Sequence, residues 1–304
     1  MKQEFYSNGK LLITGEYVVL DGADALAIPT SYGQWLLVDT IKEPKIYWNS
    51  IDEKGEIWYE DEFELINDEI FHSIHNNNET AKRLIQILNS AKQLNPDFLK
   101  QGIGFKITTK LNFPRNWGLG SSSTLINNIA NWAKVDAYKL LKETFGGSGY
   151  DIAAAQHNNP ISYSISNGMS STKEVKLQWN FTNQLFFIHL NKKQNSREGI
   201  SHYQSQKENS TLSLKEISKL TSKIISCNAL QEFESLITQH EDIISKIINQ
   251  KTIKELLFKD YSGAIKSLGA WGGDFILATG KNDDIEYFRK KGFETIIPFK
   301  NMIK

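Results

Sequence analysis

The sequence predicts an α+β protein of two domains, and three observations support this. The chain has 304 residues, which is enough for two ordinary domains with buried cores or for one large one. Short apolar runs of strand type fill its first third, whereas two strongly amphipathic helical segments occupy 212–225 and 229–248. Residues 167–175 are rich in Gly, Ser and Thr, so we place a boundary there and expect domains at 1–170 and 171–304.

The spacing of apolar residues predicts the other elements. Helical spacing predicts helices at 79–94, at 152–155 and at 285–291, and one that begins directly after Ser123. The segment that begins at Ala264 and leads to a glycine cluster is expected to be a helix or a turn. Alternating or continuous apolar runs predict strands. The expected strands are 11–14, 17–20, 34–40, 45–48, 56–59, 103–107, 161–166, 185–188, 275–278 and 295–298.

Composition excludes several classes of protein. The 35 basic residues balance the 35 acidic ones, so we expect neither a nucleic acid nor a membrane to be bound by bulk charge. Cys227 is the only cysteine, which rules out an internal disulfide and a cysteine-based zinc site. No run approaches the roughly 20 apolar residues of a membrane-spanning helix, and the start of the chain lacks the apolar core of a signal peptide. We therefore expect a cytoplasmic protein.

A Gly/Ser-rich segment in the middle of the chain is the strongest indication of a binding site. A helical pattern follows directly on Gly118-Leu119-Gly120-Ser121-Ser122-Ser123. The first N–H groups of a helix lack partners within it, and glycines let a backbone wrap closely round an anion, so this arrangement suits phosphate. The serine hydroxyls can bind phosphate oxygen or Mg²⁺. The alternative is a serine that merely caps an ordinary helix.

A second glycine-rich turn, Gly147-Ser148-Gly149-Tyr150-Asp151, also stands before a short helix. An Asp at the mouth of such a turn can accept a proton from a substrate hydroxyl or orient that hydroxyl for attack. The alternative is that Asp151 only caps the helix, which is a common role for Asp.

Two further segments carry residues that suit a phosphate or its acceptor. Lys10 follows Gly9 and precedes the segment Gly15-Glu16-Tyr17. Its ammonium group can pair with Asp151 or contact a transferring phosphate. The alternative is a solvated lysine at a strand end. Near the C-terminus, the backbone of Gly269-Ala270-Trp271-Gly272-Gly273-Asp274 can pack against a ligand. The alternative there is a tight connection between two elements.

In this order, the four segments resemble those of the GHMP kinase superfamily, which includes galactokinase, homoserine kinase, mevalonate kinase and phosphomevalonate kinase. The resemblance covers nearly the whole chain. The segment from Gly9 to Leu20 is similar to the start of phosphomevalonate kinases, in which Tyr follows the Glu, whereas mevalonate kinases usually have His there. Segments 147–151 and 269–274 also look more like the phosphomevalonate kinase versions.

The resemblance implies an N-terminal domain like domain 2 of ribosomal protein S5 and a ferredoxin-like C-terminal domain. It implies that Lys10 and Asp151 are catalytic and that Gly118–Ser123 bind the phosphates of ATP, with Ser122 as the Mg²⁺ contact. It also implies a set of substrate-binding residues, namely Glu16, Gly147, Ser148, Gly149, Arg197, Gly269, Gly272 and Gly273.

The sequence departs from the family pattern at several positions. Trp271 replaces a small residue in the last glycine cluster, which would narrow the pocket there. Ser123 and Thr124 stand where Ala is frequent, and Asn8 stands where Pro is usual. Glu143 is not at the spacing of the Glu that binds Mg²⁺ in mevalonate kinases, so we do not assign it.

The implied reaction is transfer of a phosphoryl group from ATP, with Mg²⁺, to phosphomevalonate. The alternatives are mevalonate, homoserine or a sugar as the acceptor. Two further alternatives are a non-catalytic ligand-binding relative, against which Lys10, Ser122 and Asp151 argue, and a nucleic-acid-binding module, against which the zero net charge argues. We expect a small-molecule partner, no nucleic acid and no membrane, and leave open whether the protein is a homodimer.

Overall fold

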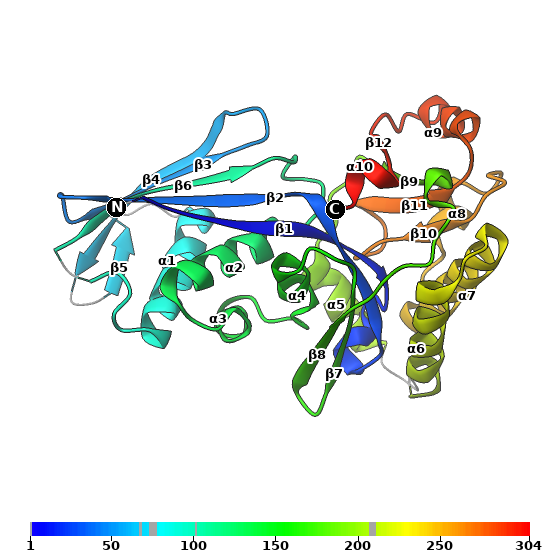
Figure 1. The fold of residues 1–304 in the computed structure, drawn as a ribbon, viewed down its shortest axis with the longest axis horizontal. Helices are drawn as coiled ribbons and strands as arrows, with labels where there is room; N and C mark the ends of the chain where they lie inside the picture. The colour runs from blue at the N-terminus through cyan, green and yellow to red at the C-terminus, as the bar shows by residue number, and fades with distance from the viewer. Residues whose placement is uncertain (1, 67–68, 73–77, 101, 207–210) are drawn as a thin grey trace. The chain divides into compact units, whose positions relative to one another are not determined.

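The structure, a computed structural model, describes residues 2–66, 69–72, 78–100, 102–206 and 211–304 (Figure 1). Helices and strands are mixed along the chain, so the α+β fold class is confirmed. The chain forms two compact units, each built from separate stretches. Unit 1 comprises Met1–Gly9, Tyr32–Arg115 and Gly120–Gln156, and unit 2 comprises Lys10–Ser31, Asn116–Leu119 and His157–Lys304. The domain boundary near residue 170 stays a prediction.

Unit 1 contains a mixed β-sheet. Its strand order is β5-β4-β3-β6-β2, with β1 also paired to β2. Strands β3 and β6 are parallel, whereas the other neighbours in this order are antiparallel. The strands are β1 (Lys2–Thr14), β2 (Ala25–Ile41), β3 (Lys45–Ile51), β4 (Ile57–Ile66), β5 (Glu69–His72) and β6 (Gly104–Leu111).

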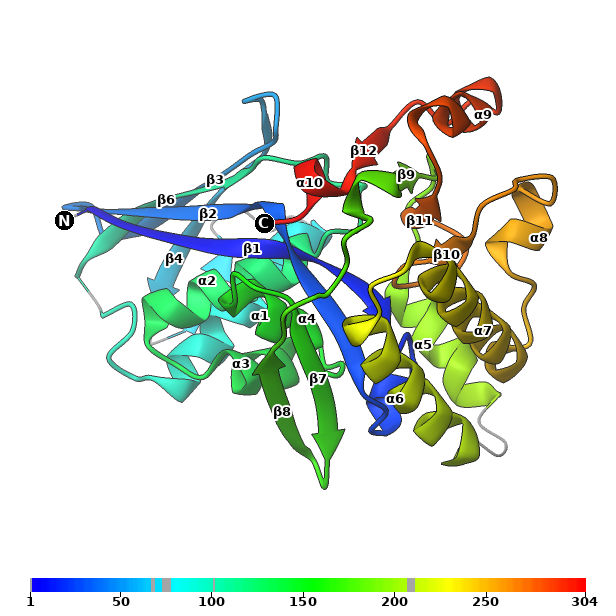
Figure 2. The ribbon, with the colours of Figure 1, turned by 45° about the vertical axis from the view of Figure 1, so that its right-hand side comes forward.

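Four helices cover one face of this sheet: α1 (Glu79–Leu94), α2 (Ser121–Ala133), α3 (Ala137–Thr144) and α4 (Tyr150–Gln156) (Figures 1 and 2). Alternate residues of the strands, among them Val38 and Trp48, form one buried cluster with Leu88 and Ile129 of the helices. Because side chains alternate between the two faces of a strand, this cluster uses the face toward the helices. Burial of each such side chain contributes about 2 kcal/mol.

Buried polar side chains fix α2 on the sheet. The hydroxyl of Ser7, in β1, donates to Oδ1 of Asn128 at 2.7 Å, and Nδ2 of Asn128 donates to the carbonyl of Gln34, in β2, at 2.9 Å. Nδ2 of Asn127 donates to the Ser7 hydroxyl at 2.9 Å, and its Oδ1 accepts from Nε2 of Gln156 in α4 at 2.9 Å. The network therefore holds α2 against both the sheet and α4.

Unit 2 contains a four-stranded antiparallel sheet of order β10-β11-β9-β12. Residues Ala25–Ala27 of β2 pair with β7, which continues into β8 as a hairpin. The strands are β7 (Ile161–Ser166), β8 (Met169–Glu174), β9 (Leu185–His189), β10 (Ile265–Ser267), β11 (Phe275–Thr279) and β12 (Ile296–Pro298). The helices are α5 (Ser196–Ser205), α6 (Thr211–Ser226), α7 (Leu230–Ile248), α8 (Ile253–Leu257), α9 (Ile285–Lys290), α10 (Phe299–Met302) and the 3-10 helices η1 (Val18–Asp21), η2 (Thr182–Gln184) and η3 (Asn282–Asp284).

Among the described residues of unit 2, two apolar clusters stand out. One packs Ile188 and Ile276 of the sheet against Phe258 and Phe288, near α8 and in α9. The other packs Ile217 of α6 and Ile244 of α7 against residues in and around η1, and it also contains Trp271. The apolar stripes that predict α6 and α7 are therefore buried, as an amphipathic pattern requires.

Most of the expected elements are confirmed, and α1 has the predicted bounds 79–94. Two expectations are wrong. Residues 17–20 do not form a strand, because Gly15 (φ 87°) and Tyr17 (φ 63°) turn the chain into η1. Residues 265–267 form a strand rather than a helix or turn, because Ile265 pairs with Ala278 across β10 and β11.

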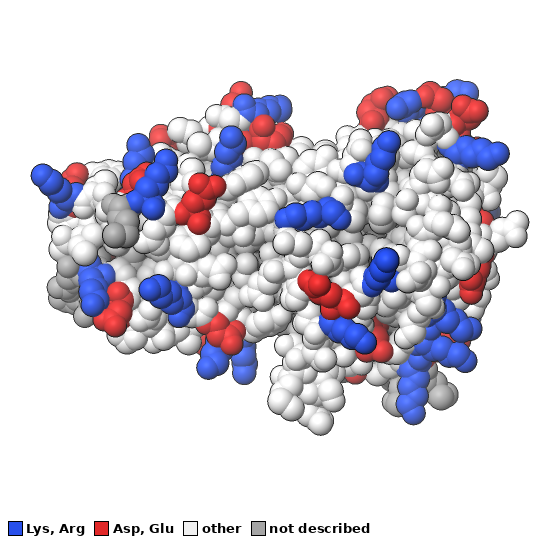
Figure 3. All heavy atoms as spheres, viewed as in Figure 1, with Lys and Arg blue, Asp and Glu red and all other residues white. Residues whose placement is uncertain are grey.

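The surface shows mixed charge. On the face that Figure 3 shows, acidic and basic side chains are interspersed among the described residues. Among the helices of the described part of the chain, none is both long enough and apolar enough to cross a membrane.

We expect Asn128→Ala to lower the free energy of unfolding by about 2 kcal/mol, because it removes the acceptor of the buried Ser7 O–H and a donor to the Gln34 carbonyl. Urea denaturation followed by circular dichroism measures this change. Asn131→Ala, on the exposed face of the same helix, is the matched control. Equal stability of the two variants would contradict the role given to the network.

Candidate functional site

The residues that the sequence indicates divide between the two units. Unit 1 holds Gly120–Ser123 at the start of α2 and Gly147–Asp151 at the start of α4. Unit 2 holds the rest, namely Lys10, Glu16, Gly118, Leu119, Arg197, Gly269, Gly272 and Gly273.

The start of α2 lacks a capping side chain. Its N-cap is Gly120, whose φ of 89° lies in the left-handed region that favours glycine. The alternative of a serine cap is therefore wrong. The Ser123 hydroxyl donates to the Gly120 carbonyl at 2.8 Å instead of accepting from an N–H group, and Ser122 is exposed. The N–H groups at this end, with the positive end of the helix dipole, fit an anionic ligand.

A buried threonine holds the turn before α2. The hydroxyl of Thr124, at a position where Ala is frequent in the family, lies 2.8 Å from Oε1 of Gln34 and 3.1 Å from the Gly120 carbonyl. Since Gln34 belongs to β2, this contact fixes Gly120 relative to the sheet of unit 1.

Asp151 lies inside the first turn of α4. Three glycines with positive φ lead to this helix: Gly146 (67°), Gly147 (101°) and Gly149 (83°). The helix begins at Tyr150, and the Gly149 carbonyl accepts the N–H of Ala153 at 3.0 Å, so the cap position falls on Gly149 and not on Asp151. A carboxylate in a first turn is favoured by the helix dipole.

Helices α2 and α4 pack together, and Gln156 binds Asn127 across them. Unit 1 therefore brings the serines of α2 and the carboxylate of α4 onto adjacent helices. The sequence indicates both segments, but their adjacency depends on the packing.

Lys10 contacts the glycine-rich segment within unit 2. Its Nζ donates to the carbonyl of Gly118 at 3.1 Å, and its backbone N–H donates to the carbonyl of Leu119 at 3.0 Å. The residue is half-buried in the middle of β1. The alternative of a solvated lysine at a strand end is therefore wrong, and Lys10 stands beside the turn that leads into α2.

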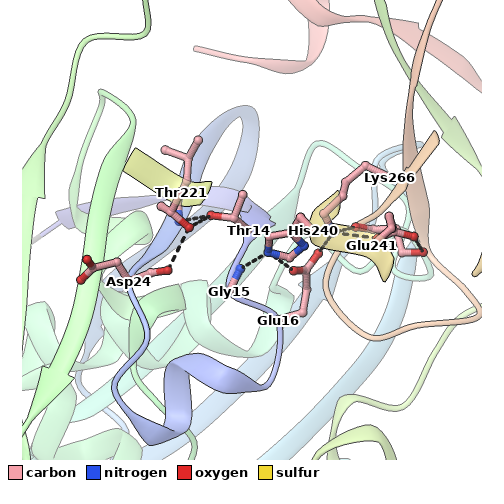
Figure 4. Close-up of polar contacts among 10 residues, drawn as sticks. Thr14, Gly15, Glu16, Asp24, Thr221, His240, Glu241 and Lys266 are labelled. Atoms are coloured by element: carbon pink, nitrogen blue, oxygen red, sulfur yellow. Dashed lines mark hydrogen bonds and ion pairs between the residues drawn. The ribbon is translucent and has the colours of Figure 1, made fainter. Parts of the chain in front are cut away.

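The Glu16 side chain is buried in a cluster of charged groups (Figure 4). Its Oε1 forms an ion pair with Nζ of Lys266, which also contacts Oε1 of Glu241 at 3.0 Å and the Ser267 carbonyl at 2.7 Å. The Ser267 hydroxyl donates to the other oxygen of Glu241 at 2.9 Å. The cluster joins the end of β1 to β10 and α7.

The charges in this cluster do not balance, because two carboxylates share one ammonium. Burial, together with the charge of Glu241, raises the pKa of Glu16 to about 7, although Lys266 opposes the rise. His240 is neutral, because burial and then Lys266 hold its pKa well below the usual value. Its Nε2 accepts the N–H of Gly15 at 3.0 Å, which assigns the proton to Nδ1.

The same residues do not fit a metal ion. Ligand atoms of Glu16, His240 and Glu241 lie within 4.8 Å of one another. However, the Lys266 ammonium contacts both carboxylates, and the Nε2 lone pair of His240 already accepts a hydrogen bond. Mg²⁺ in kinases binds mainly substrate phosphates, water and few protein oxygens. The exposed hydroxyl of Ser122 fits that requirement, and its role as the Mg²⁺ contact stays a prediction.

The last glycine cluster forms the turn between β10 and β11. Gly269 (φ 67°) and Gly272 (φ 92°) adopt backbone conformations that favour glycine, and a Cβ on Gly273 would lie 2.8 Å from the Lys192 carbonyl. The Trp271 N–H donates to the hydroxyl of Tyr17 at 2.9 Å. The indole of Trp271 is only 4% exposed, in the apolar cluster around η1, so this bulky residue adds to the core.

Arg197 is exposed in the first turn of α5, where Oδ1 of the N-cap Asn195 accepts its backbone N–H at 3.1 Å. Its role toward a substrate stays a prediction. Sequence reasoning missed Lys266 and Glu241. Lys266 directly precedes the glycine cluster, but a lysine in a short strand normally extends into solvent, and only its carboxylate partners explain its burial.

Solved structures resemble the fold closely. Methanococcus jannaschii mevalonate kinase superposes with a TM-score of 0.69 at 16% identity, over 98% of this chain and 97% of that chain. This protein has the GHMP kinase fold. Streptococcus pneumoniae phosphomevalonate kinase in complex with phosphomevalonate and AMPPNP gives 0.66 at 13% identity, over 97% and 99%. Lactococcus lactis galactokinase complexed with galactose gives 0.65 at 14%, over 95% and 88%.

Comparison of sequences alone gives no such match, since no family model and no curated protein matches this GHMP-fold chain. The similarity to solved structures, in contrast, confirms the resemblance expected from the four motif segments.

We expect the Glu16 carboxyl to make stability depend on pH. Its pKa is about 7 in the folded protein and near 4.5 in the unfolded chain. The folded state therefore binds the proton more tightly, so this stabilisation is complete below pH 4.5 and is lost as the pH rises to about 7. Glu16→Gln should remove this dependence, as measured by the difference in free energy of unfolding between wild type and variant from pH 4.5 to 8. A constant difference would contradict the assignment, and the exposed Glu216→Gln is the control.

Proposed function

We propose that this protein is an ATP-dependent kinase that transfers the γ-phosphoryl group to phosphomevalonate, with mevalonate as the alternative acceptor. The observation that carries the proposal is the uncapped, glycine-led start of α2, with Lys10 bound to the adjacent Gly118 carbonyl. The GHMP kinase fold supports it, and one similar structure holds phosphomevalonate together with AMPPNP. Such an enzyme would serve isoprenoid precursor synthesis by the mevalonate pathway in the cytoplasm.

Each predicted residue has a chemical task in this reaction. The N–H groups at Ser121–Ser123 would bind the phosphates of ATP, and Lys10 would contact the transferring phosphoryl group. Mg²⁺, with Ser122 as a ligand, would neutralise the charge of the triphosphate. Asp151 would orient the acceptor oxygen, and would take its proton if the acceptor is the hydroxyl of mevalonate.

The acceptor would contact a further group of residues. Arg197 presents an exposed guanidinium, which suits the phosphate of phosphomevalonate. Glu16 would act through the buried ion pair with Lys266 rather than by touching the acceptor, because its side chain is 1% exposed. The other residues assigned to the acceptor are Ser148 and five glycines, namely Gly147, Gly149, Gly269, Gly272 and Gly273.

We expect Asp151→Asn to lower kcat by about 10², because it disturbs the orientation of the acceptor oxygen, and by up to about 10⁴ if the acceptor is a hydroxyl whose proton Asp151 takes. ATP affinity should change little, since Asp151 is not part of the phosphate-binding turn. A coupled ADP-release assay measures turnover, and Asp97→Asn, an exposed residue of the same unit, is the control. Unchanged turnover would remove Asp151 from the mechanism.

The same assay identifies the acceptor. It is run with phosphomevalonate, mevalonate, homoserine and galactose at equal concentration. Phosphomevalonate should give the highest kcat/KM. Highest activity with another compound would select that alternative, and ADP release with none of them would contradict the proposed function.

We expect Ser122→Ala to raise the KM for Mg·ATP roughly tenfold, because it removes an oxygen that contacts a charged ligand. A titration of activity with Mg²⁺ at fixed ATP measures the effect. Ser171→Ala, on exposed β8, is the control. An unchanged Mg²⁺ dependence would exclude Ser122 as the metal contact.

A further inference from the structure

The last glycine cluster borders a hollow beside α8, which we call the α8 hollow. Its volume is about 300 Å³, within the size range of small-molecule sites. It lies where the segment between α7 and α8, α8 itself, the end of β10 and the following turn meet. Helix α8 and strand β10 pack against each other (Figure 1), and all of these segments belong to unit 2. The wall of the α8 hollow includes Lys251, Ile253, Leu256, Ser267, Trp271 and Gly272.

The wall of the α8 hollow is mostly apolar. Ile253 and Trp271 are buried residues of the wall, whereas Leu256 is 58% exposed. An apolar occupant would remove part of the Leu256 side chain from water, and this removal is favourable in proportion to the area covered. The α8 hollow therefore suits the apolar body of a ligand.

Two donors in the wall indicate an anionic partner. Lys251 is exposed and is the only charged residue among those that line the α8 hollow. Within the described part of the chain its ammonium forms no ion pair, and the Glu255 carboxylate accepts the N–H and the hydroxyl of Thr252 instead. The indole N–H of Trp271 is buried, and no described residue accepts it, which is uncommon for a buried donor. Both donors suit an oxygen of an anionic group.

The size of the α8 hollow limits its occupant. One water takes about 30 Å³ in the liquid, so the volume corresponds to roughly ten non-hydrogen atoms. Phosphomevalonate does not suit this wall, because it carries both a carboxylate and a phosphate. A single lysine among mostly apolar residues would leave one of these anions unpaired.

We propose that the α8 hollow binds a second ligand, a small molecule with an apolar body and one anionic group, about ten non-hydrogen atoms in all. The body covers Leu256 and Trp271, and the anionic group pairs with Lys251. Because Trp271 and Gly272 belong to the glycine-rich turn, the ligand contacts that turn directly. The site itself does not rest on the proposed function, and only its distinction from the acceptor does.

Octanoate is the probe, since it has an apolar chain, one carboxylate and the required size. The indole N–H resonances of ¹⁵N-labelled protein are followed as octanoate is added, and that of Trp271 is assigned from Trp271→Phe. Octanoate should shift the Trp271 resonance to saturation. Octylammonium, which has the same chain and the opposite charge, should bind roughly tenfold more weakly. No shift of Trp271 with octanoate, or equal affinity for the two probes, would overturn the inference.

Two pairs of variants locate the binding. Leu256→Glu places a negative charge in the wall and should weaken octanoate binding roughly tenfold or more. Its matched control is Leu257→Glu, because Leu257 is exposed on the same helix but does not line the α8 hollow. Lys251→Gln should weaken binding roughly tenfold, whereas Lys259→Gln, another exposed lysine of this region, should not. Unchanged affinity in Leu256→Glu or Lys251→Gln, or equal losses in a variant and its control, would contradict the site.

The same titration in saturating phosphomevalonate tests whether the site is separate from that of the acceptor. Octanoate should bind with unchanged affinity. Displacement of octanoate would assign the α8 hollow to the acceptor and overturn the inference. None of these measurements needs turnover. A protein that binds octanoate at Trp271 but phosphorylates none of the four acceptors would therefore contradict the proposed function and still support this site.

Discussion

The Lys266 ammonium, buried between Glu16 and Glu241, is the interaction on which unit 2 depends most. It is fully buried, and its three contacts join β1, α7 and the backbone of β10. Removing one partner of such a pair leaves an uncompensated charge in the interior and typically costs 3–5 kcal/mol. The pair also fixes the two sequence segments that flank it, since Glu16 precedes Tyr17, whose hydroxyl holds Trp271 in the last glycine cluster. Ionic contacts therefore position two turns that have no regular structure of their own.

The two units use different means to hold their glycine-rich turns. In unit 1, neutral amides and hydroxyls fix α2 through hydrogen bonds in which neither the donor nor the acceptor carries a net charge. Because these groups are neutral, the network adds no charge beside the start of α2. In unit 2, charged groups dominate around Lys266. Buried charges must be locally paired, and Lys266 with Glu16 and Glu241 follows that rule.

Regular periodicity made much of the fold predictable. The stripe of α1 and the long amphipathic patterns of α6 and α7 predict helices close to those observed, because one apolar face must be buried. Residues 17–20 are expected to form a strand because they are a short apolar run. The positive φ angles of Gly15 and Tyr17 turn the chain into a 3-10 helix instead, and the pattern of apolar residues does not indicate such angles. For the site, glycine-rich segments locate the turns, but the partners of Glu16 stand more than 220 residues away in the chain. No local pattern contains that information.

The order in which unit 2 is assembled follows from these distant partners. Thr14 contacts Thr221, Gly15 contacts His240 and Glu16 contacts Lys266, with separations of 207, 225 and 250 residues. During synthesis on the ribosome, the segment 10–31 emerges more than 200 residues before its partners. Its apolar and acidic side chains stay exposed to chaperones and to competing contacts until residue 266 has left the exit tunnel. Synthesis of the chain through residue 266, rather than of segment 10–31 alone, is therefore the step that allows these contacts to form.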